Sequence, residues 1–577
     1  MSSRLWTVPN IESGNVLFMV ILVGAAFTGF SLTTWQDVRG VLSQIIDDTF
    51  YYSVTAFHIS RGLGSTFDGI HLTNGYHPLW LLVQIPLFLV FPRMTETSFR
   101  LILGVQVLLA IFSVLLIYNI IRRQSHNTVV AFAVASAWIA LQRRDLITGL
   151  ETPLYTVALL CVAYQIVVGV DTEHSIRDYV LLGTLCSVAA LARLDGIFLG
   201  VAIGIPLFFR WLRSRDRTSF GRMMGFGVPI TITMLTYFAV NIALFGLFMP
   251  ISGYIKQLDR ATKPGFTDPG LFDYVQLLFW PLSAPRAHLL KILGLYGYPL
   301  LLSGLWLWRR KPGVSTYYGK VKRWWPFGVF TWMLLIYYVV AYYDPQGSTA
   351  YWYYAPARIM GILTAALLIE VTYSFLVANF PSVKSHAWPT LLIILLGMLL
   401  AWRLQFSFLR IISAIGATGL FLIAWRFTVG RARQVLVAGL VTLLAVLLPL
   451  LTVARTMLEF RPTNATAYYD AAMWIRTNTP DQSTVAAYNA GTMGFFSGRR
   501  VINLDGYINE RAFRDKVQRW GLLGYLVTNS VDYLVDCFPR DPQFEQLPPY
   551  MGHSLQLIWK APTLYRSCEL RAYRVEP

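Results

Sequence analysis

The feature that most limits what this chain can fold into is a succession of long apolar runs. Many of them approach or exceed the roughly 17–25 residues that a helix needs to cross the hydrocarbon core of a bilayer. The composition agrees, because 55% of the 577 residues are hydrophobic and 14% are charged. A soluble globular chain has about 25% charged residues. We therefore predict a polytopic α-helical membrane protein.

The net charge of +18 is concentrated in short loops between the apolar runs, at 210–217, 309–325 and 426–433. Cytoplasmic loops of membrane proteins carry such an excess of Lys and Arg, so this placement predicts orientation and contact with lipid headgroups. It argues against a nucleic acid as the partner.

The apolar runs predict about thirteen membrane spans, with the N-terminus in the cytoplasm and the C-terminus outside. A shorter run, "PLWLLVQIPLFLVF" (78–91), contains a proline and is predicted to be an interfacial or half-inserted helix. The expected spans are 16–35, 99–121, 128–142, 152–170, 179–193, 197–212, 222–245, 290–308, 326–343, 355–378, 388–403, 407–425 and 434–453.

The last part of the chain has a different, more polar composition. "AAMWIRTNTP" (471–480) reads as a helix that stops before a proline, "STVAAY" and "RRVINLDG" read as strands, and "YLVTNSVDYLVD" (525–536) as a helix end followed by a strand. We predict a transmembrane domain over 1–455, with a first outer loop at 36–98, and an extracytoplasmic α/β domain over 456–577.

Two adjacent carboxylates stand out in the first outer loop. In "IIDDTFYYSVTAFHISRG" (45–62), Asp47 and Asp48 precede a run of aromatic residues, and several histidines and an asparagine follow before Trp80. A partly desolvated carboxylate at a membrane surface can take a proton from a hydroxyl or bind a metal. The alternative is that the acids only end a span and the aromatics anchor the interface.

Five motifs in order along the chain resemble the landmarks of the C-type (GT-C) membrane glycosyltransferases. They are "DDTFYY…FDGIHLTNGYHPLW", "TGLETPLY" (148–155), "LARLDG" (191–196), "LFGLFMPISGYIK" (244–256) and "YWYYAPAR" (351–358). The superfamily includes protein O-mannosyltransferases, lipid A aminoarabinose transferases and mycobacterial arabinofuranosyltransferases. The resemblance covers essentially the whole chain but selects no single member family.

The resemblance implies an inverting transferase that takes a sugar from a polyprenyl-phosphate donor to a glycan, lipid or protein acceptor. It implies a bacterial-type inner (plasma) membrane protein whose active site faces the extracytoplasmic side. The first acid of the pair, matching Asp47, would be the general base, and Asp48 would assist or help to hold a divalent ion such as Mg, Mn or Ca. Metal dependence and the sugar (arabinofuranose, mannose or aminoarabinose) stay open.

Other candidate residues have two interpretations each. Glu151, before Pro153, is a second active-site carboxylate or a charge at a helix N-terminus. Arg193 faces the donor phosphate or forms an ion pair with Asp195. The further candidates for substrate or phosphate binding are Lys256, Arg358, Tyr354, His71, Asn74 and His77, of which His77 is the preferred histidine. In the outer domain, Asn489, Asp505, Tyr507 and Arg511 are candidates for acceptor binding.

Two rival functions fit part of the pattern. A transporter or flippase of lipid-linked sugars would also have many spans and intramembrane charges. However, the sequence shows no inverted repeat, and its acids concentrate in an outer loop. A binding or sensor domain with a membrane anchor would not need so many spans.

Overall fold

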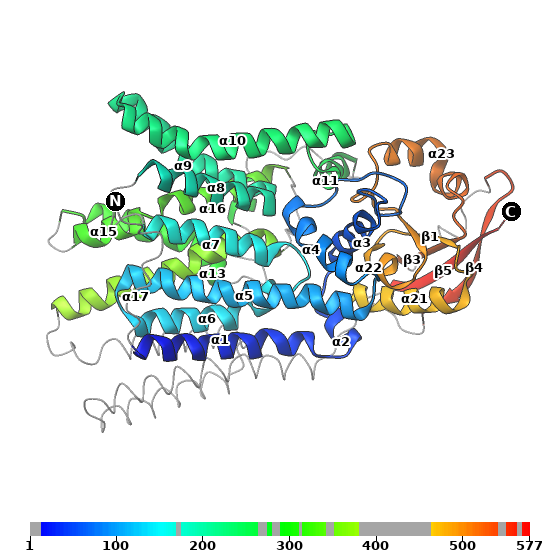
Figure 1. The fold of residues 1–577 in the computed structure, drawn as a ribbon, viewed down its shortest axis with the longest axis horizontal. Helices are drawn as coiled ribbons and strands as arrows, with labels where there is room; N and C mark the ends of the chain where they lie inside the picture. The colour runs from blue at the N-terminus through cyan, green and yellow to red at the C-terminus, as the bar shows by residue number, and fades with distance from the viewer. Residues whose placement is uncertain are drawn as a thin grey trace, which may run out of the picture.

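The computed structural model describes residues 13–168, 175–262, 274–279, 289–310, 314–341, 351–379, 463–539, 550–561 and 568–576. The molecule is elongated, with a bundle of long helices at one end and a small sheet with its helices at the other (Figure 1). The residues that follow the first long helix lie between these two parts (Figure 1).

The bundle helices run along the long axis of the molecule (Figure 1). Local sequence explains several of their ends: Thr95 and Ser98 cap each other's backbone at the start of α5, and Gly246 ends α10 with φ +64°. The long helices are α1 (Ser13–Thr34), α5 (Glu96–Ser125), α6 (Thr128–Leu146), α7 (Thr152–Val168), α8 (Ile176–Ala192), α9 (Ile197–Ser214), α10 (Arg217–Phe245), α14 (Tyr298–Leu307), α16 (Trp325–Ala341) and α17 (Ala355–Asn379).

In the described residues, five helices are long and apolar enough to cross a membrane, and a sixth if α15 (Val314–Lys322) and α16, bent by 48°, form one span. These spans confirm a multi-pass helical protein. Other expected spans form shorter apolar helices, including α7. The expected spans 388–403, 407–425 and 434–453 lie outside the described residues, so the count of thirteen stays a prediction.

Glycines allow close approach of bundle helices at two crossings. A Cβ on Gly183 of α8 would lie 2.2 Å from the carbonyl oxygen of Phe226 in α10. A Cβ on Gly361 of α17 would lie 1.9 Å from the carbonyl oxygen of Leu290 in α13 (Leu289–Ile292). Small residues at interfaces let membrane helices pack by backbone contact, so these positions fix the helix spacing.

Shorter helices lie at the junction between the bundle and the sheet (Figure 1). The 13-residue α4 confirms a separate helix close to the predicted 78–91 and begins with proline at its first position. These helices are α2 (Val38–Leu42), α3 (Thr49–Ser60), α4 (Pro78–Val90) and α11 (Ile251–Thr262). Three irregular turns of helix occur in the bundle: η1 (Leu194–Gly196), the π-helical η2 (Leu293–Gly297) and η3 (Tyr351–Tyr354).

The C-terminal region is a five-stranded sheet of order β2-β1-β3-β5-β4, parallel at β2-β1-β3 and antiparallel at β3-β5-β4. The strands are β1 (Thr484–Ala487), β2 (Arg500–Asn503), β3 (Tyr533–Pro539), β4 (Ser554–Lys560) and β5 (Cys568–Glu576). The helices are α21 (Asn464–Asn478), α22 (Gly491–Phe496) and α23 (Phe513–Thr528). The predicted α/β character is confirmed, whereas the boundary near residue 455 lies outside the described residues.

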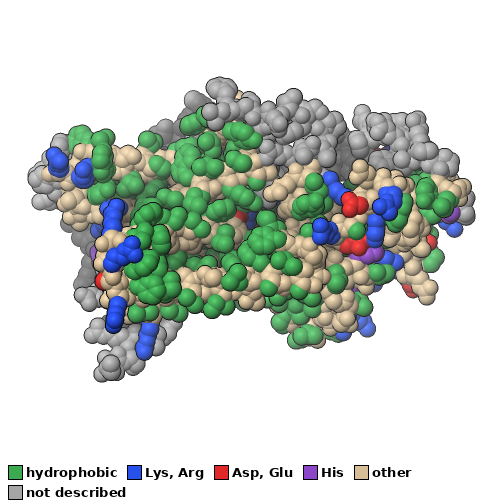
Figure 2. Space-filling view, turned by 90° about the horizontal axis from the view of Figure 1, so that it is seen from above, with side chains coloured by type: hydrophobic (Ala, Val, Ile, Leu, Met, Phe, Trp, Pro, Cys, Tyr) green, Lys and Arg blue, Asp and Glu red, His purple; other side chains and the backbone are tan. Residues whose placement is uncertain are grey.

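The surface of the helical part is dominated by hydrophobic side chains (Figure 2). Lys and Arg gather at the end far from the sheet, and acidic, basic and histidine side chains gather at the sheet end (Figure 2). Large apolar side chains such as Phe209 (54% exposed) and Leu235 (64% exposed) face outward from α9 and α10. Such a belt fits contact with lipid.

Candidate active site

The first outer loop is held between the bundle and the C-terminal region. The ring of Phe50 in α3 lies 5.0 Å from those of Phe99 in α5 and Phe495 in α22. A Cβ on Gly75 would lie 1.9 Å from the carbonyl oxygen of Tyr507, so the loop and the C-terminal region touch through their backbones. This contact closes one side of a cavity.

The cavity at this junction has a volume of about 80 Å³. It combines the first outer loop, the two residues just before α7, α11, η3 and the turn after β2. Its lining residues are Asp48, Tyr51, Tyr52, Gly75, His77, Leu150, Glu151, Ser252, Lys256, Trp352, Tyr353 and Tyr507. Five candidates from the sequence therefore meet in one place: Asp48, His77, Glu151, Lys256 and, from the C-terminal region, Tyr507.

Asp48 lies in the turn just before α3 and contributes its carboxylate to the wall of this cavity. Burial raises the pKa of Asp48; the positive charge of Lys256 opposes the rise and the negative charge of Glu151 adds to it. Among the described residues, no side chain donates a hydrogen bond to the carboxylate of Asp48. A carboxylate with a raised pKa and no side-chain donor is suited to proton transfer.

Lys256 projects from α11 on the same cavity. Its Nζ donates a hydrogen bond to the Tyr353 hydroxyl (3.1 Å) and lies 5.5 Å from the ring centroid of Tyr507. Burial disfavours the charged form of Lys256, but the interactions with Tyr353 and Asp48 favour it more strongly. The pKa of Lys256 is therefore raised. Lys256 is thus a cation at neutral pH.

Glu151 is buried immediately before α7 and is shared among several groups. It accepts a hydrogen bond from the Tyr52 hydroxyl (2.9 Å), and its Oε1 lies 3.5 Å from Nη1 of Arg193 and 3.9 Å from Nε2 of His77. The Nδ1 of His77 is buried and has no hydrogen-bond partner among the described residues. Glu151 therefore links the cavity to Arg193.

Arg193 is 2% exposed, and both terminal nitrogens of its guanidinium contact protein groups. Its guanidinium forms an ion pair with Asp195 (2.8 Å), donates to the Tyr338 hydroxyl (3.0 Å) and to the carbonyl of Trp352 (3.2 Å), and lies over the ring of Tyr353. The ion pair is the one that the sequence offered as an alternative. Arg193 is absent from the lining of the described cavity.

Asp47 faces away from the cavity, toward the start of α22. Its Oδ2 accepts the backbone N–H of Gly491 (2.8 Å), and its Oδ1 accepts the backbone N–H (2.8 Å) and the hydroxyl (2.5 Å) of Thr492. Burial raises the pKa of Asp47 to about 6, although these hydrogen bonds oppose the rise. Asp47 thus satisfies helix-terminal donors of the C-terminal region.

The remaining candidates lie outside this cavity. Asn74 bonds to Asn241 (2.7 Å) and to the N–H of Ile251 (3.0 Å), which pins the loop to α10 and α11. His71 bonds to Asp68 (2.6 Å) beside α23. Arg358 is buried in α17 and forms an ion pair with Asp145, and the Tyr354 ring lies under Lys291 (4.4 Å).

The sequence interpretation missed two aromatic residues of the wall and named Asp505, an acid behind the wall, only as a candidate for acceptor binding. Trp352 and Tyr353 lie in "YWYYAPAR", where Tyr354 was the candidate. Asp505 accepts a hydrogen bond from the Tyr51 hydroxyl (2.7 Å), and burial raises its pKa to about 7.

The arrangement of the acidic pair does not fit a metal site that Asp47 and Asp48 would share, the possibility that the sequence left open. The two oxygens of Asp47 already accept hydrogen bonds from three protein donors at the start of α22. Asp48 lines the cavity instead, so the two carboxylates face different parts of the protein. In the described part of the chain, no group of three or more His, Cys, Asp or Glu residues has a geometry that could hold a metal ion.

The fold is similar to that of ArnT from Cupriavidus metallidurans, solved bound to undecaprenyl phosphate (14% identity, TM-score 0.55) and in the apo state (13% identity, TM-score 0.56). Each match covers 96% of this chain and 97% of ArnT. The oligosaccharyltransferase AglB from Archaeoglobus fulgidus, in complex with an inhibitory peptide and a dolichol-phosphate, matches at 13% identity and TM-score 0.49, over 91% of this chain and 70% of AglB.

Residues 458–573 match a family model described as a domain of unknown function, DUF8728. Among curated protein sequences, none matches this chain. ArnT and AglB are both GT-C glycosyltransferases. The similarity to ArnT confirms the GT-C-like fold that the sequence predicted.

Proposed function

Starting from this GT-C-like fold, we propose that the chain is a membrane glycosyltransferase that moves a sugar from a polyprenyl-phosphate donor to an acceptor hydroxyl. The observation that carries the proposal is the meeting of Asp48, Glu151 and Lys256 on one cavity wall beside aromatic side chains. ArnT was solved with undecaprenyl phosphate bound, which supports a polyprenyl phosphate as the carrier of the sugar here.

The general base in this proposal is Asp48, in place of Asp47. A base must reach the proton of the acceptor hydroxyl, and Asp48 lines the cavity. Asp47 accepts three hydrogen bonds from Gly491 and Thr492, so its oxygens are engaged in holding α22. The raised pKa of Asp48 also makes its carboxylate a stronger base than an exposed aspartate.

The reaction is a single displacement. Asp48 takes the proton of the acceptor hydroxyl while the hydroxyl oxygen forms a bond to the anomeric carbon. The bond between that carbon and the phosphate oxygen breaks, and its electron pair leaves with the polyprenyl phosphate. Attack from the face opposite the leaving group inverts the anomeric configuration.

Lys256 is the cation best placed to neutralise the leaving phosphate. A fixed positive charge stabilises the transition state where negative charge develops, and Lys256 lines the same cavity as the base. Arg193 is already engaged by Asp195, Tyr338 and Glu151, so its proposed role is to position Glu151.

The cavity is small for a sugar. Its volume of about 80 Å³ is below the range of roughly 300–1,000 Å³ for ligand pockets, so substrates require the walls to separate. Tyr507 is the wall residue from the C-terminal region. To admit substrates, either this region moves relative to the first outer loop or the Tyr507 side chain rotates. We place this region and the cavity on the extracytoplasmic side of a bacterial-type inner membrane, since Lys and Arg gather at the other end.

The test is sugar transfer from synthetic polyprenyl-phosphate donors by the full chain in detergent. Asp48→Asn should lower kcat by about 10²–10⁴-fold, as expected for loss of a general base, with an unchanged melting temperature. Asp47→Asn is the matched control. It should lower the melting temperature, which Asp48→Asn leaves unchanged, and it should reduce kcat less than Asp48→Asn does. Equal transfer by Asp48→Asn and wild type would overturn the assignment, and a chelator arm tests metal dependence.

A further inference from the structure

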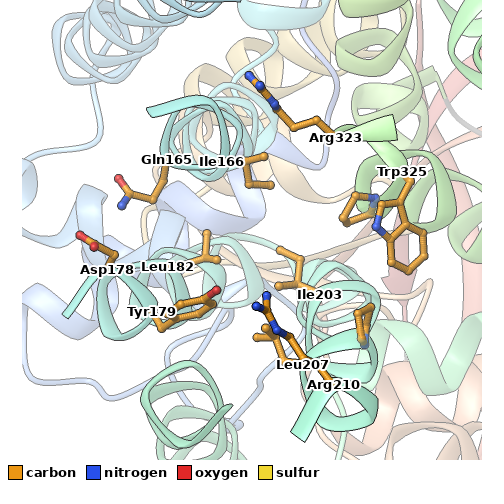
Figure 3. Close-up of a pocket in the computed structure, with 12 residues that line it drawn as sticks. Gln165, Ile166, Asp178, Tyr179, Leu182, Ile203, Leu207, Arg210, Arg323 and Trp325 are labelled. Carbon is orange, nitrogen blue, oxygen red and sulfur yellow. The ribbon is translucent and has the colours of Figure 1, made fainter. Parts of the chain in front are cut away.

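A second cavity lies at the opposite end of the bundle from the sheet. Its volume is about 440 Å³, and it is enclosed by the end of α7, the start of α8, the second half of α9 and the start of α16. Figure 3 shows its lining side chains, which are Gln165, Ile166, Asp178, Tyr179, Leu182, Ile203, Pro206, Leu207, Arg210, Arg323, Trp325 and Pro326. The catalytic proposal uses none of these residues.

Among the described residues that line this cavity, basic side chains outnumber acidic ones. Arg210 and Arg323 lie on opposite sides of the cavity, and the guanidinium of Arg323 points away from Arg210 (Figure 3). The guanidinium of Arg222 in α10 lies 6.0 Å from the ring centroid of Tyr179, and its buried Nε has no hydrogen-bond partner among the described residues. The acid of the lining, Asp178, accepts hydrogen bonds from the backbone and hydroxyl of Ser175 (2.8 and 3.0 Å), so it serves the start of α8.

The inner wall of the cavity is apolar. Leu182 and Ile203 are almost fully buried there, and Leu207 and Ile166 continue the apolar surface. A second hollow of about 570 Å³ adjoins the first, because Pro206 and Arg210 line both. Phe209, which is 54% exposed, belongs to this second hollow together with Arg213. Arg210 therefore stands between a cavity with an apolar inner wall and a second hollow to which Pro206 and Phe209 contribute apolar surface.

We propose that this double hollow binds an anionic phospholipid, with its phosphate at Arg210 and one acyl chain along each hollow. Basic pockets between membrane helices are sites for anionic headgroups. The guanidinium fork matches phosphate oxygens, and the tyrosine hydroxyl and glutamine amide of the lining add donors.

Two observations favour a two-chain phospholipid over a polyprenyl phosphate. The two hollows share Arg210, which suits one phosphate with two chains, whereas a polyprenyl phosphate has a single chain. The site also lies at the opposite end of the helices from Asp48, because α7 begins beside Glu151 and ends at this cavity. The proposal therefore stands independently of the transfer reaction.

The experiment is native mass spectrometry of the delipidated full chain, titrated with dioleoyl-phosphatidylglycerol, dioleoyl-phosphatidylcholine or undecaprenyl phosphate. We expect tighter binding of phosphatidylglycerol than of the other two. Arg210→Gln should weaken it about fivefold, the effect of one arginine near an anionic lipid surface. Arg177→Gln, an exposed arginine at the same end outside both linings, is the matched control and should bind like wild type.

A second variant tests the apolar part without changing charge. Leu207→Trp fills the cavity and should weaken binding of phosphatidylglycerol while its melting temperature shows that it is folded. Equal binding of phosphatidylcholine and phosphatidylglycerol, or unchanged binding by Arg210→Gln, would overturn the proposal. Preference for undecaprenyl phosphate would also overturn it, since a carrier lipid would then be the occupant.

Discussion

Asp47 and Asp48 are neighbours in sequence, yet they belong to two different regions of the molecule. The Asp47 side of the loop is a closed contact, in which each carboxylate oxygen has protein donors from α22. The Asp48 side is an open wall, shared with Lys256 and Glu151. The comparison teaches that burial alone does not mark a functional acid, because burial raises the pKa of both.

The largest effect on stability should come from the closed side. Asp47→Ala leaves the two N–H groups and the hydroxyl at Gly491 and Thr492 buried without an acceptor, which costs about 3–5 kcal/mol in total. Thermal unfolding should show this loss. Asp48→Ala is the control and should change the melting temperature little. Similar losses in both variants would mean that the two sides do not differ as described.

A slightly smaller effect, on activity, is expected on the open side. Lys256→Gln should lower kcat about 10²–10³-fold, because it removes a charge placed at the leaving phosphate. Lys256→Arg should recover part of the rate, since it restores the cation. Arg193→Gln is the contrasting variant: it breaks a buried ion pair and should lower the melting temperature. A wild-type kcat in Lys256→Gln would contradict the placement of the leaving phosphate beside Lys256.

A third variant tests how tight the closed side is. A Cβ on Gly491 would lie 2.2 Å from the backbone oxygen of Asp47, and that oxygen cannot rotate away. Gly491→Ala should therefore cost about 1–3 kcal/mol, as overpacking does. Gly319→Ala is the control, because it has open space around it. Equal melting temperatures for the two variants would contradict the close contact.

The fold was largely predictable because hydrophobic length and turn residues are local signals. The bundle helices, the strands β1 and β2 and the separate helix α4 all follow from such patterns. The identity of the cavity acid was not predictable. It depends on a hydrogen bond between Asp47 and Gly491, 444 residues away, and no local pattern encodes that contact.

The aromatic part of the site shows the same limit. Tyr353 and Tyr354 are identical and adjacent, but the 3₁₀ turn η3 directs Tyr353 to Lys256 and Tyr354 to Lys291. Arg358, one helical turn later, reaches Asp145 in α6. Which side chain faces which partner is set by the rotation of one turn, and composition cannot fix it.

The smallest predicted effect lies at another contact of the first outer loop with the C-terminal region, between His71 and Asp68 next to Glu510. The hydrogen bond to Asp68 raises the pKa of His71, and the His71 bonds hold the pKa of Asp68 below its ordinary value against burial. A raised histidine pKa gives stability that is complete below about pH 6.5 and is lost as pH rises through the folded pKa. Because the pKa of Asp68 is lowered, its contribution to stability is complete above about pH 4 and is lost as pH falls through the folded pKa.

Wild type should therefore exceed His71→Gln in stability between about pH 4 and 6.5, by less than about 1 kcal/mol since the pair is partly exposed, and the difference should shrink toward pH 9. Melting temperatures of both proteins across this range measure it. His58→Gln is the matched control in the same loop: burial lowers the pKa of His58, so its difference from wild type should grow in favour of wild type as pH rises. If the stability differences of His71→Gln and His58→Gln from wild type changed with pH in the same direction, charged His71 would not be stabilised by Asp68.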